Sequence, residues 1–193
     1  MRQSAAYGRA ESRARRALRE RLAPLGMAEA GAHELGAIRA LAAGTISPDV
    51  AGEAALQAIY RRTGYGFYVA RDGGAISALI ALVLLNDAGF AAIRRETFNS
   101  LNPSLSHAAR ADEEPVAVYG WGIAAANREA ARIVVDGGWA VLEALPSQPF
   151  FARAATDAGR RLLTEKMRFV PYPGSATGLL WWEYGHTSER RAA

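Results

Sequence analysis

The segment DAGRRLLTEKMRF, residues 157–169, follows a β-rich run at residues 149–154 and precedes two more short strand-like segments. Upstream of these, the run VAVYGWGI at residues 116–123 leads into a helix that is predicted to begin near Asn127. The resulting order is strand, helix, strand, helix, strand, strand. Strands that alternate with helical segments indicate an α/β fold built around one sheet.

A β-hairpin is predicted before this region. Residues 67–71 and 75–85 read as strands, and Asp72-Gly73-Gly74 between them is a hairpin turn signal. Residues 89–101 are predicted to hold a short helix around 91–98. Residues 102–114 carry proline, serine, histidine and acids without periodicity, which indicates a loop and a candidate substrate-side flap.

The N-terminal third is predicted to be helical. Residues 4–22 place apolar side chains at helical spacing opposite a row of arginines, and Pro24 and Gly26 end that helix. A second helix is expected at residues 28–43. Ser47-Pro48-Asp49 supplies start signals, with Ser47 as N-cap, for a third helix that runs through about Arg62.

The positive charge is concentrated at the N-terminus. Residues 1–24 hold seven arginines and two glutamates, so they contribute 7 − 2 = +5 to a total of +4 and leave −1 for the rest. Such a segment fits a basic arm for nucleic acid, an acidic partner or anionic lipid. It equally fits a solvated helix face that docks on the domain through its Leu/Ala stripe.

The composition excludes several classes of protein. The 193 residues are 50% hydrophobic and 22% charged, which is typical of one globular domain. No cysteine is present, and the three histidines lack metal-ligand spacing, so disulfides and a transition-metal site are not expected. No apolar run reaches the length of about 20 residues that a transmembrane helix needs, and no secretory signal is evident. We expect a cytoplasmic protein, and the Ala- and Arg-rich composition is typical of a GC-rich bacterium.

The helix at residues 157–169 carries a resemblance to a known family. Leu163, Glu165, Lys166 and Phe169 match the pattern Asn-x-x-Ala-x-x-Leu-Tyr-Glu-Lys-Leu-Gly-Phe. The chain resembles the GNAT-type acyl-CoA N-acyltransferases over residues 67–183. The resemblance implies a mixed, mainly antiparallel sheet flanked by helices in a single domain at residues 27–193. The helical extension, including the basic helix at residues 1–26, is then expected to stand where the family has its first strand.

The resemblance also implies a site for acetyl-CoA or another acyl-CoA between two splayed parallel strands. The pyrophosphate would rest on the start of the helix near Asn127, because the first N–H groups of a helix lack partners and its dipole favours anions. Gly-x-Gly-x-Ala here reproduces part of the family loop Gln/Arg-x-x-Gly-x-Gly/Ala, although the two glycines equally fit a β-bulge. The expected cofactor residues are Gly120, Gly122, Ala124, Ala125, Ala126, Asn127, Arg128 and Thr164.

Amine acylation needs a group that takes the ammonium proton. Glu113 and Glu114 precede the predicted strand at 116–123 and Tyr119 lies within it, although acids at that place equally fit ordinary loop charges. Thr164 stands where the family has an acidic tyrosine, and Thr is a far weaker acid. Tyr172 is therefore the expected substitute.

Two functions of different class remain open. The first is an acyl-CoA-dependent N-acyltransferase that moves an acyl group, expected to be acetyl, to an unknown amine acceptor. The toxin-activating lysine acyltransferases are a distant variant of this kind. The second is a GNAT-fold module that has lost catalysis and binds a partner, which the missing Gln/Arg, Asn and Tyr positions favour. A homodimer is an open expectation in either case.

Overall fold

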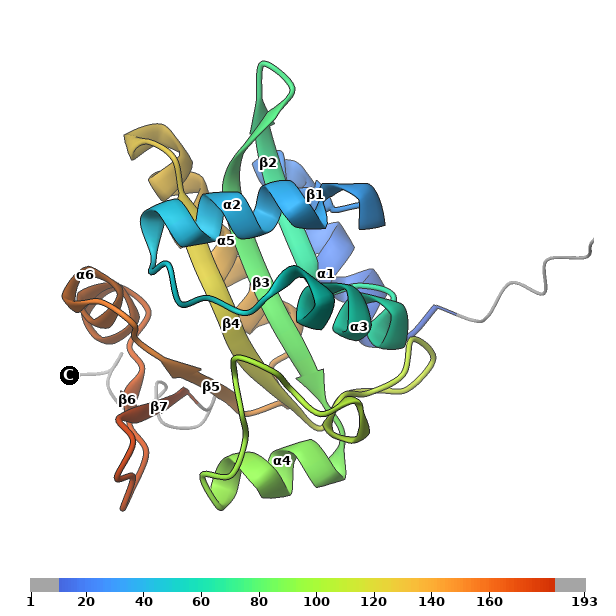
Figure 1. The fold of residues 1–193 in the computed structure, drawn as a ribbon, viewed down its shortest axis with the longest axis vertical. Coiled ribbons are helices and arrows are strands. Elements are labelled where there is room, and N and C mark those ends of the chain that lie inside the picture. Colours follow the sequence, from blue (N-terminus) through green and yellow to red (C-terminus); the bar gives the residue numbers. More distant parts are fainter. Residues whose placement is uncertain (1–10, 183–193) are drawn as a thin grey trace, which may run out of the picture.

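The computed structural model describes residues 11–182, which form an α/β fold around one seven-stranded mixed sheet (Figure 1). The strand order is β1-β2-β3-β4-β5-β7-β6. The strands are β1 (Ala28–Glu29), β2 (Phe67–Asp72), β3 (Ala75–Leu85), β4 (Ala117–Ala125), β5 (Phe150–Arg153), β6 (Val170–Pro171) and β7 (Leu179–Trp182). The helices are α1 (Arg13–Leu22), α2 (Leu35–Thr45), α3 (Glu53–Thr63), α4 (Asp87–Arg94), α5 (Arg128–Ala144) and α6 (Asp157–Arg161), with short turns η1 (Ala23–Leu25), η2 (Ala32–Glu34), η3 (Leu105–His107) and η4 (Leu162–Lys166).

The sheet is mainly antiparallel, as the sequence predicts. Only β4 and β5 run parallel, and α5 forms the crossover that a parallel pair requires. The predicted hairpin is confirmed: Gly73 and Gly74 join β2 to β3 with φ of +56° and +86°, which glycine adopts without steric cost.

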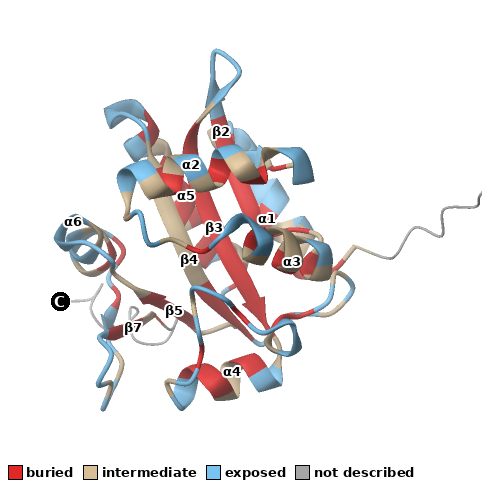
Figure 2. Ribbon diagram, in the orientation of Figure 1, coloured by how far each residue is buried: buried red, intermediate tan, exposed pale blue. Residues whose placement is uncertain are grey.

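Helices cover both faces of the sheet. Alternate residues of β3 point to opposite faces, so Ile80 packs in one cluster with Leu18 of α1 and Val134 of α5, whereas Leu79 packs in another with residues of α2 and α3. A third cluster, on the same face as α2, joins α4 to the sheet. We call the side of α1 and α5 the first face and the side of α2, α3 and α4 the second face. Figure 2 shows β3 buried along most of its length between these two layers.

The predicted start of the domain needs correction. Ala28 and Glu29 form the edge strand β1, paired with Val69 and Tyr68 of β2, so a first strand is present and helices do not replace it. The predicted helix at residues 28–43 begins only at Leu35. A two-residue strand is shorter than a sequence pattern can register, because its signal is one backbone pairing rather than a period.

Two other helix starts were also predicted wrongly. The third helix begins at Glu53 with Gly52 as N-cap, because the Ser47 side chain accepts a hydrogen bond from the N–H of Asp49 and closes a local turn instead. Helix α4 begins at Asp87, earlier than predicted, because Asn86 caps it by accepting from the N–H of Gly89.

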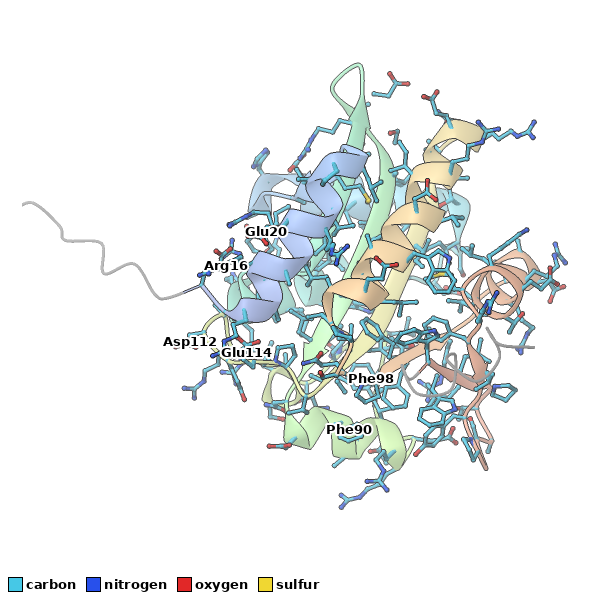
Figure 3. The ribbon with its side chains drawn as sticks, turned by 180° about the vertical axis from the view of Figure 1, so that it is seen from behind. Arg16, Glu20, Phe90, Phe98, Asp112 and Glu114 are labelled. Atoms are coloured by element: carbon cyan, nitrogen blue, oxygen red, sulfur yellow. The ribbon has the colours of Figure 1, made fainter. Side chains whose placement is uncertain are left out.

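The N-terminal helix docks on the domain through its apolar stripe. Ala14, Leu18 and Leu22 are buried against α5, and Figure 3 shows the two helices side by side on the first face. Arg15 pairs with Glu29 at 2.7 Å. The described helix begins at Arg13, and the predicted helical residues 4–10 lie outside the described residues.

The match to the Glu-Lys-x-Gly-Phe helix exit has a conformational counterpart. The helix α6 continues into the π-helical turn η4, and Arg168 then adopts a left-handed φ of +61°. The Phe169 N–H donates to the carbonyl of Leu163 at 2.9 Å, which closes the helix end. Arg168 therefore occupies the position where the family pattern has glycine.

Replacing Arg168 with glycine is expected to raise the free energy of unfolding by about 1 kcal/mol, because the left-handed conformation strains every residue that has a Cβ. Chemical denaturation measures this change. Lys166→Gly, two residues earlier in helical backbone, is the control and should lower stability by roughly 0.5–1 kcal/mol. An equal loss of stability in both variants would contradict the left-handed conformation of Arg168.

Candidate functional site

A β-bulge interrupts β4 at its centre. Leu82 of β3 pairs with Gly120 and Ala81 pairs with Gly122, so Trp121 is an extra residue without an opposite partner on β3. A bulge bends its strand and increases the local twist. Gly120 and Gly122 fitted either a phosphate-binding loop or a β-bulge, and the bulge is confirmed.

The parallel pairing of β4 and β5 ends at this bulge. Its register covers Val118–Phe150, Tyr119–Phe151 and Gly120–Ala152. Strand β4 continues to Ala125 in contact with β3, and β5 ends at Arg153 in contact with β7. The two strands therefore diverge beyond Gly120 and Ala152, and the edge of β4 that faces the opening has no neighbouring strand among the described residues.

A cavity of about 470 Å³ occupies this opening and reaches both faces of the sheet. Its first-face wall comes from α5 and from the segment after β5, including Val134, Gly138 and Leu163. Its second-face wall comes from α2 and the α2–α3 connection, including Ile38 and Val50. Most of the lining side chains are aliphatic or small. A cavity of this size and character is typical of a small-molecule site.

The start of α5 borders the cavity on the first face. Ala125 and Ala131, which flank the first turn, both line the cavity. Asn127 is the N-cap, as predicted, and its side chain accepts from the N–H of Ala130 at 2.9 Å. The N–H groups of Arg128 and Glu129 have no partner within the helix.

Some of the other predicted cofactor residues line the cavity and some do not. Gly120, Gly122 and Ala124 line the cavity together with Ala125. The N–H of Ala126 donates to the carbonyl of Ser77 at 2.8 Å and is not available to a ligand. The side chain of Arg128 is exposed beside the opening and does not line the cavity.

The two predicted catalytic glutamates lie away from the cavity. Glu114 accepts hydrogen bonds from the backbone N–H groups of Arg13 and Ala14, so it caps the start of α1. Figure 3 shows Glu114 at that end of the helix. Glu113 accepts from the N–H of Arg110 within its own loop. Their position before β4 suggested catalysis, but Glu114 caps a helix that is distant in sequence and Glu113 closes a turn in its own loop.

Of the residues predicted to contribute a hydroxyl group, Tyr119 is the one that lines the cavity. Tyr119 is buried against Phe98, and no residue in the described part of the chain hydrogen-bonds its hydroxyl. The Thr164 hydroxyl instead donates to the carbonyl of Arg160 at 2.9 Å. Tyr172 packs edge-on against Phe151 and Trp181, outside the cavity lining.

Sequence reasoning missed three charged residues that line the cavity, namely Arg39 of α2, Asp49 of the α2–α3 connection and Arg153 of β5. Asp49 is the one carboxylate in the cavity wall formed by residues 11–182. Ser47-Pro48-Asp49 gave a signal, but it was read as a helix start. Arg39 gave none, because one arginine on an amphipathic helix is ordinary.

Comparisons with known proteins place the chain in no family: no family model matches it, and no curated protein matches it either. Within residues 11–182, no cluster of acidic or histidine side chains fits a metal ion. In the same segment, no helix is both long enough and apolar enough to cross a membrane.

Proposed function

We propose that the protein transfers an acyl group from acyl-CoA to an amine. The observation that carries this proposal is the cavity at the point where β4 and β5 separate, beside the bulge at Trp121. A strand edge without a neighbour offers backbone N–H and C=O groups to a ligand. The pantetheine arm of an acyl-CoA has the amide groups to pair with such an edge.

The topology supports the same family that residues 157–169 resemble. The order β1-β2-β3-β4-β5-β7-β6, with one parallel pair in the middle, is the arrangement expected of a GNAT-type sheet. The left-handed Arg168 at the glycine position of the family pattern supports it independently. Helices α1 and α4 are then additions to that fold.

The chemistry of the proposed transfer can be assigned to groups in the cavity wall. The amine nitrogen attacks the thioester carbonyl carbon, and the C–S bond breaks as the tetrahedral intermediate collapses. N–H groups on the free edge of β4 would stabilise the oxyanion. Asp49 takes the role first given to Glu113 and Glu114 and accepts the amine proton, directly or through water, and the Tyr119 hydroxyl protonates the leaving thiolate.

A binding module without catalysis is the second candidate. It is favoured by one observation: the Thr164 hydroxyl, at the position of the family's acidic tyrosine, is held by the Arg160 carbonyl and does not line the cavity. A module of this kind would bind a partner and transfer no acyl group. The transferase would consume acyl-CoA when a suitable amine is present.

Isothermal titration with acetyl-CoA and with longer acyl-CoAs tests the proposal. We expect saturable binding of at least one of them. Release of free thiol in the presence of amines then separates the transferase from the module. Absence of binding by every acyl-CoA would sink the transferase and favour the partner-binding module.

Arg128 gives a sharper test of where the phosphates bind. Arg128→Ala is expected to weaken acyl-CoA binding by about 1–2 kcal/mol, the scale of a charge-assisted hydrogen bond. Arg61→Ala, which removes another exposed arginine at the end of α3, is the control and should bind normally. An unchanged affinity in Arg128→Ala would remove the start of α5 from the site.

A further inference from the structure

Two of the arginines that line the cavity have no acidic partner among residues 11–182. Arg39 is half-buried, and no described residue forms a hydrogen bond or an ion pair with its guanidinium group. Arg153 is also half-buried, and within the described part of the chain its guanidinium donates only to the Thr177 hydroxyl, at 2.9 and 3.1 Å. Partly desolvated arginines are normally paired, because the charge is costly to bury alone.

Both arginines belong to the second face. Ile38, the neighbour of Arg39, packs with Leu79 and Ala81 in the second-face cluster. Phe151 packs with Tyr119 on the same face, and residues two apart on a strand share a face, so Arg153 points there as well. Arg39, which belongs to α2, therefore borders the opening from the β4 side, and Arg153 borders it from the β5 side.

The position of Arg153 is fixed by a chain of contacts. The Thr177 hydroxyl accepts from Arg153 and donates to Glu96 at 2.8 Å, and Glu96 is also bound by Ser175 and by the Ala176 N–H. These bonds lower the pKa of Glu96, so its carboxylate stays ionised. Thr177 therefore holds the guanidinium of Arg153, a residue of β5 that lines the opening.

We infer that the second-face side of the cavity binds an acceptor amine that also carries an anionic group, either a carboxylate or a phosphate. The inference rests on the proposed function, which places the acyl-CoA phosphates at the start of α5, on the opposite face. Guanidinium groups match planar carboxylate and phosphate oxygens with paired N–H donors. Asp49, which lines the same side, supplies the one negative charge in the wall and would receive the ammonium end.

Direct titration of three probes that share a 2-aminoethyl group tests this inference. The probes are ethanolamine, β-alanine and O-phosphoethanolamine, and binding to the full chain is measured by calorimetry or NMR without acyl-CoA. At least one anionic probe should bind about tenfold more tightly than ethanolamine, and Arg39→Gln or Arg153→Gln should remove about tenfold of that affinity. Arg61→Gln is the matched control and should change nothing.

Each outcome decides the inference. A preference for β-alanine alone or for O-phosphoethanolamine alone identifies the anion, and a preference for both supports a general anion site. Equal binding of ethanolamine, no binding of any probe, or undiminished anion binding in both arginine variants overturns it. A separate titration with acyl-CoA reports on the proposed function. A protein that binds the anionic probes but no acyl-CoA would therefore refute only the proposed acyl transfer.

Discussion

Gly89→Ala is expected to lower the free energy of unfolding by about 3 kcal/mol, at the upper end of the usual cost of overpacking. A Cβ on Gly89 of α4 would stand 2.2 Å from the carbonyl oxygen of His107. That carbonyl cannot retreat easily. It accepts from the N–H of Asn86, whose side chain also donates to the carbonyl of Ser106, so the loop is held against the helix.

Gly44→Ala is the matched control for this prediction. Gly44 also lies within a helix, α2, but a Cβ there would meet no atom within 4 Å. Alanine should then raise stability by about 0.5–1 kcal/mol through helix propensity. Urea denaturation of both variants measures the difference. A Gly89→Ala protein as stable as the wild type would mean that α4 does not approach the η3 turn this closely.

The second large effect is a loss of stability at alkaline pH. Burial raises the pKa of Tyr65 from 10 to about 12, although its hydrogen bond to Ser12 works in the opposite direction. Burial also raises the pKa of Tyr68 well above its ordinary value, with Glu29 adding to the effect. Both hydroxyl groups lie under α1, so deprotonation of either would place a negative charge in the first-face core.

The loss of stability at alkaline pH follows from the raised pKa values of the two tyrosines. Below pH 10 both tyrosines are neutral in the folded and unfolded chains, and their contribution to stability is fully present. Between pH 10 and 12 the unfolded chain loses protons that the folded chain keeps, so stability falls. The rise in the pKa of Tyr65 from 10 to about 12 corresponds to a loss of about 2 kcal/mol at pH 12, and Tyr68 adds to this loss.

Denaturation curves at several pH values check this expectation, with two variants. Tyr65→Phe should reduce the alkaline loss but forfeits the hydrogen bond to Ser12 at neutral pH. Tyr68→Phe should reduce the loss and also raise stability at neutral pH by about 1 kcal/mol, because no residue from 11 to 182 hydrogen-bonds its buried hydroxyl. A double variant with the wild-type pH profile would show that neither tyrosine is responsible.

Local chemistry made part of the fold predictable from the sequence. Runs rich in apolar and β-forming residues located β2, β3 and β4. Asp72-Gly73-Gly74 specified the hairpin of β2 and β3, because only glycine takes successive left-handed φ angles easily. Asn127 was predictable as the cap of α5 because a cap bonds to residues only a few positions away. The helix at residues 157–169 could be compared with a family pattern because that pattern is also a short, continuous stretch of sequence.

Which side chains share the site depends on the packing of elements that are distant in sequence. Glu114 looked like a base beside a strand, but the start of α1, about a hundred residues earlier in the chain, takes both of its carboxylate oxygens. Conversely, Arg39, Asp49 and Arg153 carry no common signal in the sequence. They come to one cavity because the bulge at Trp121 turns β4 away from β5 and α2 lies across the opening. Local patterns encode elements, whereas a site depends on how distant elements pack, and no short stretch of sequence contains that information.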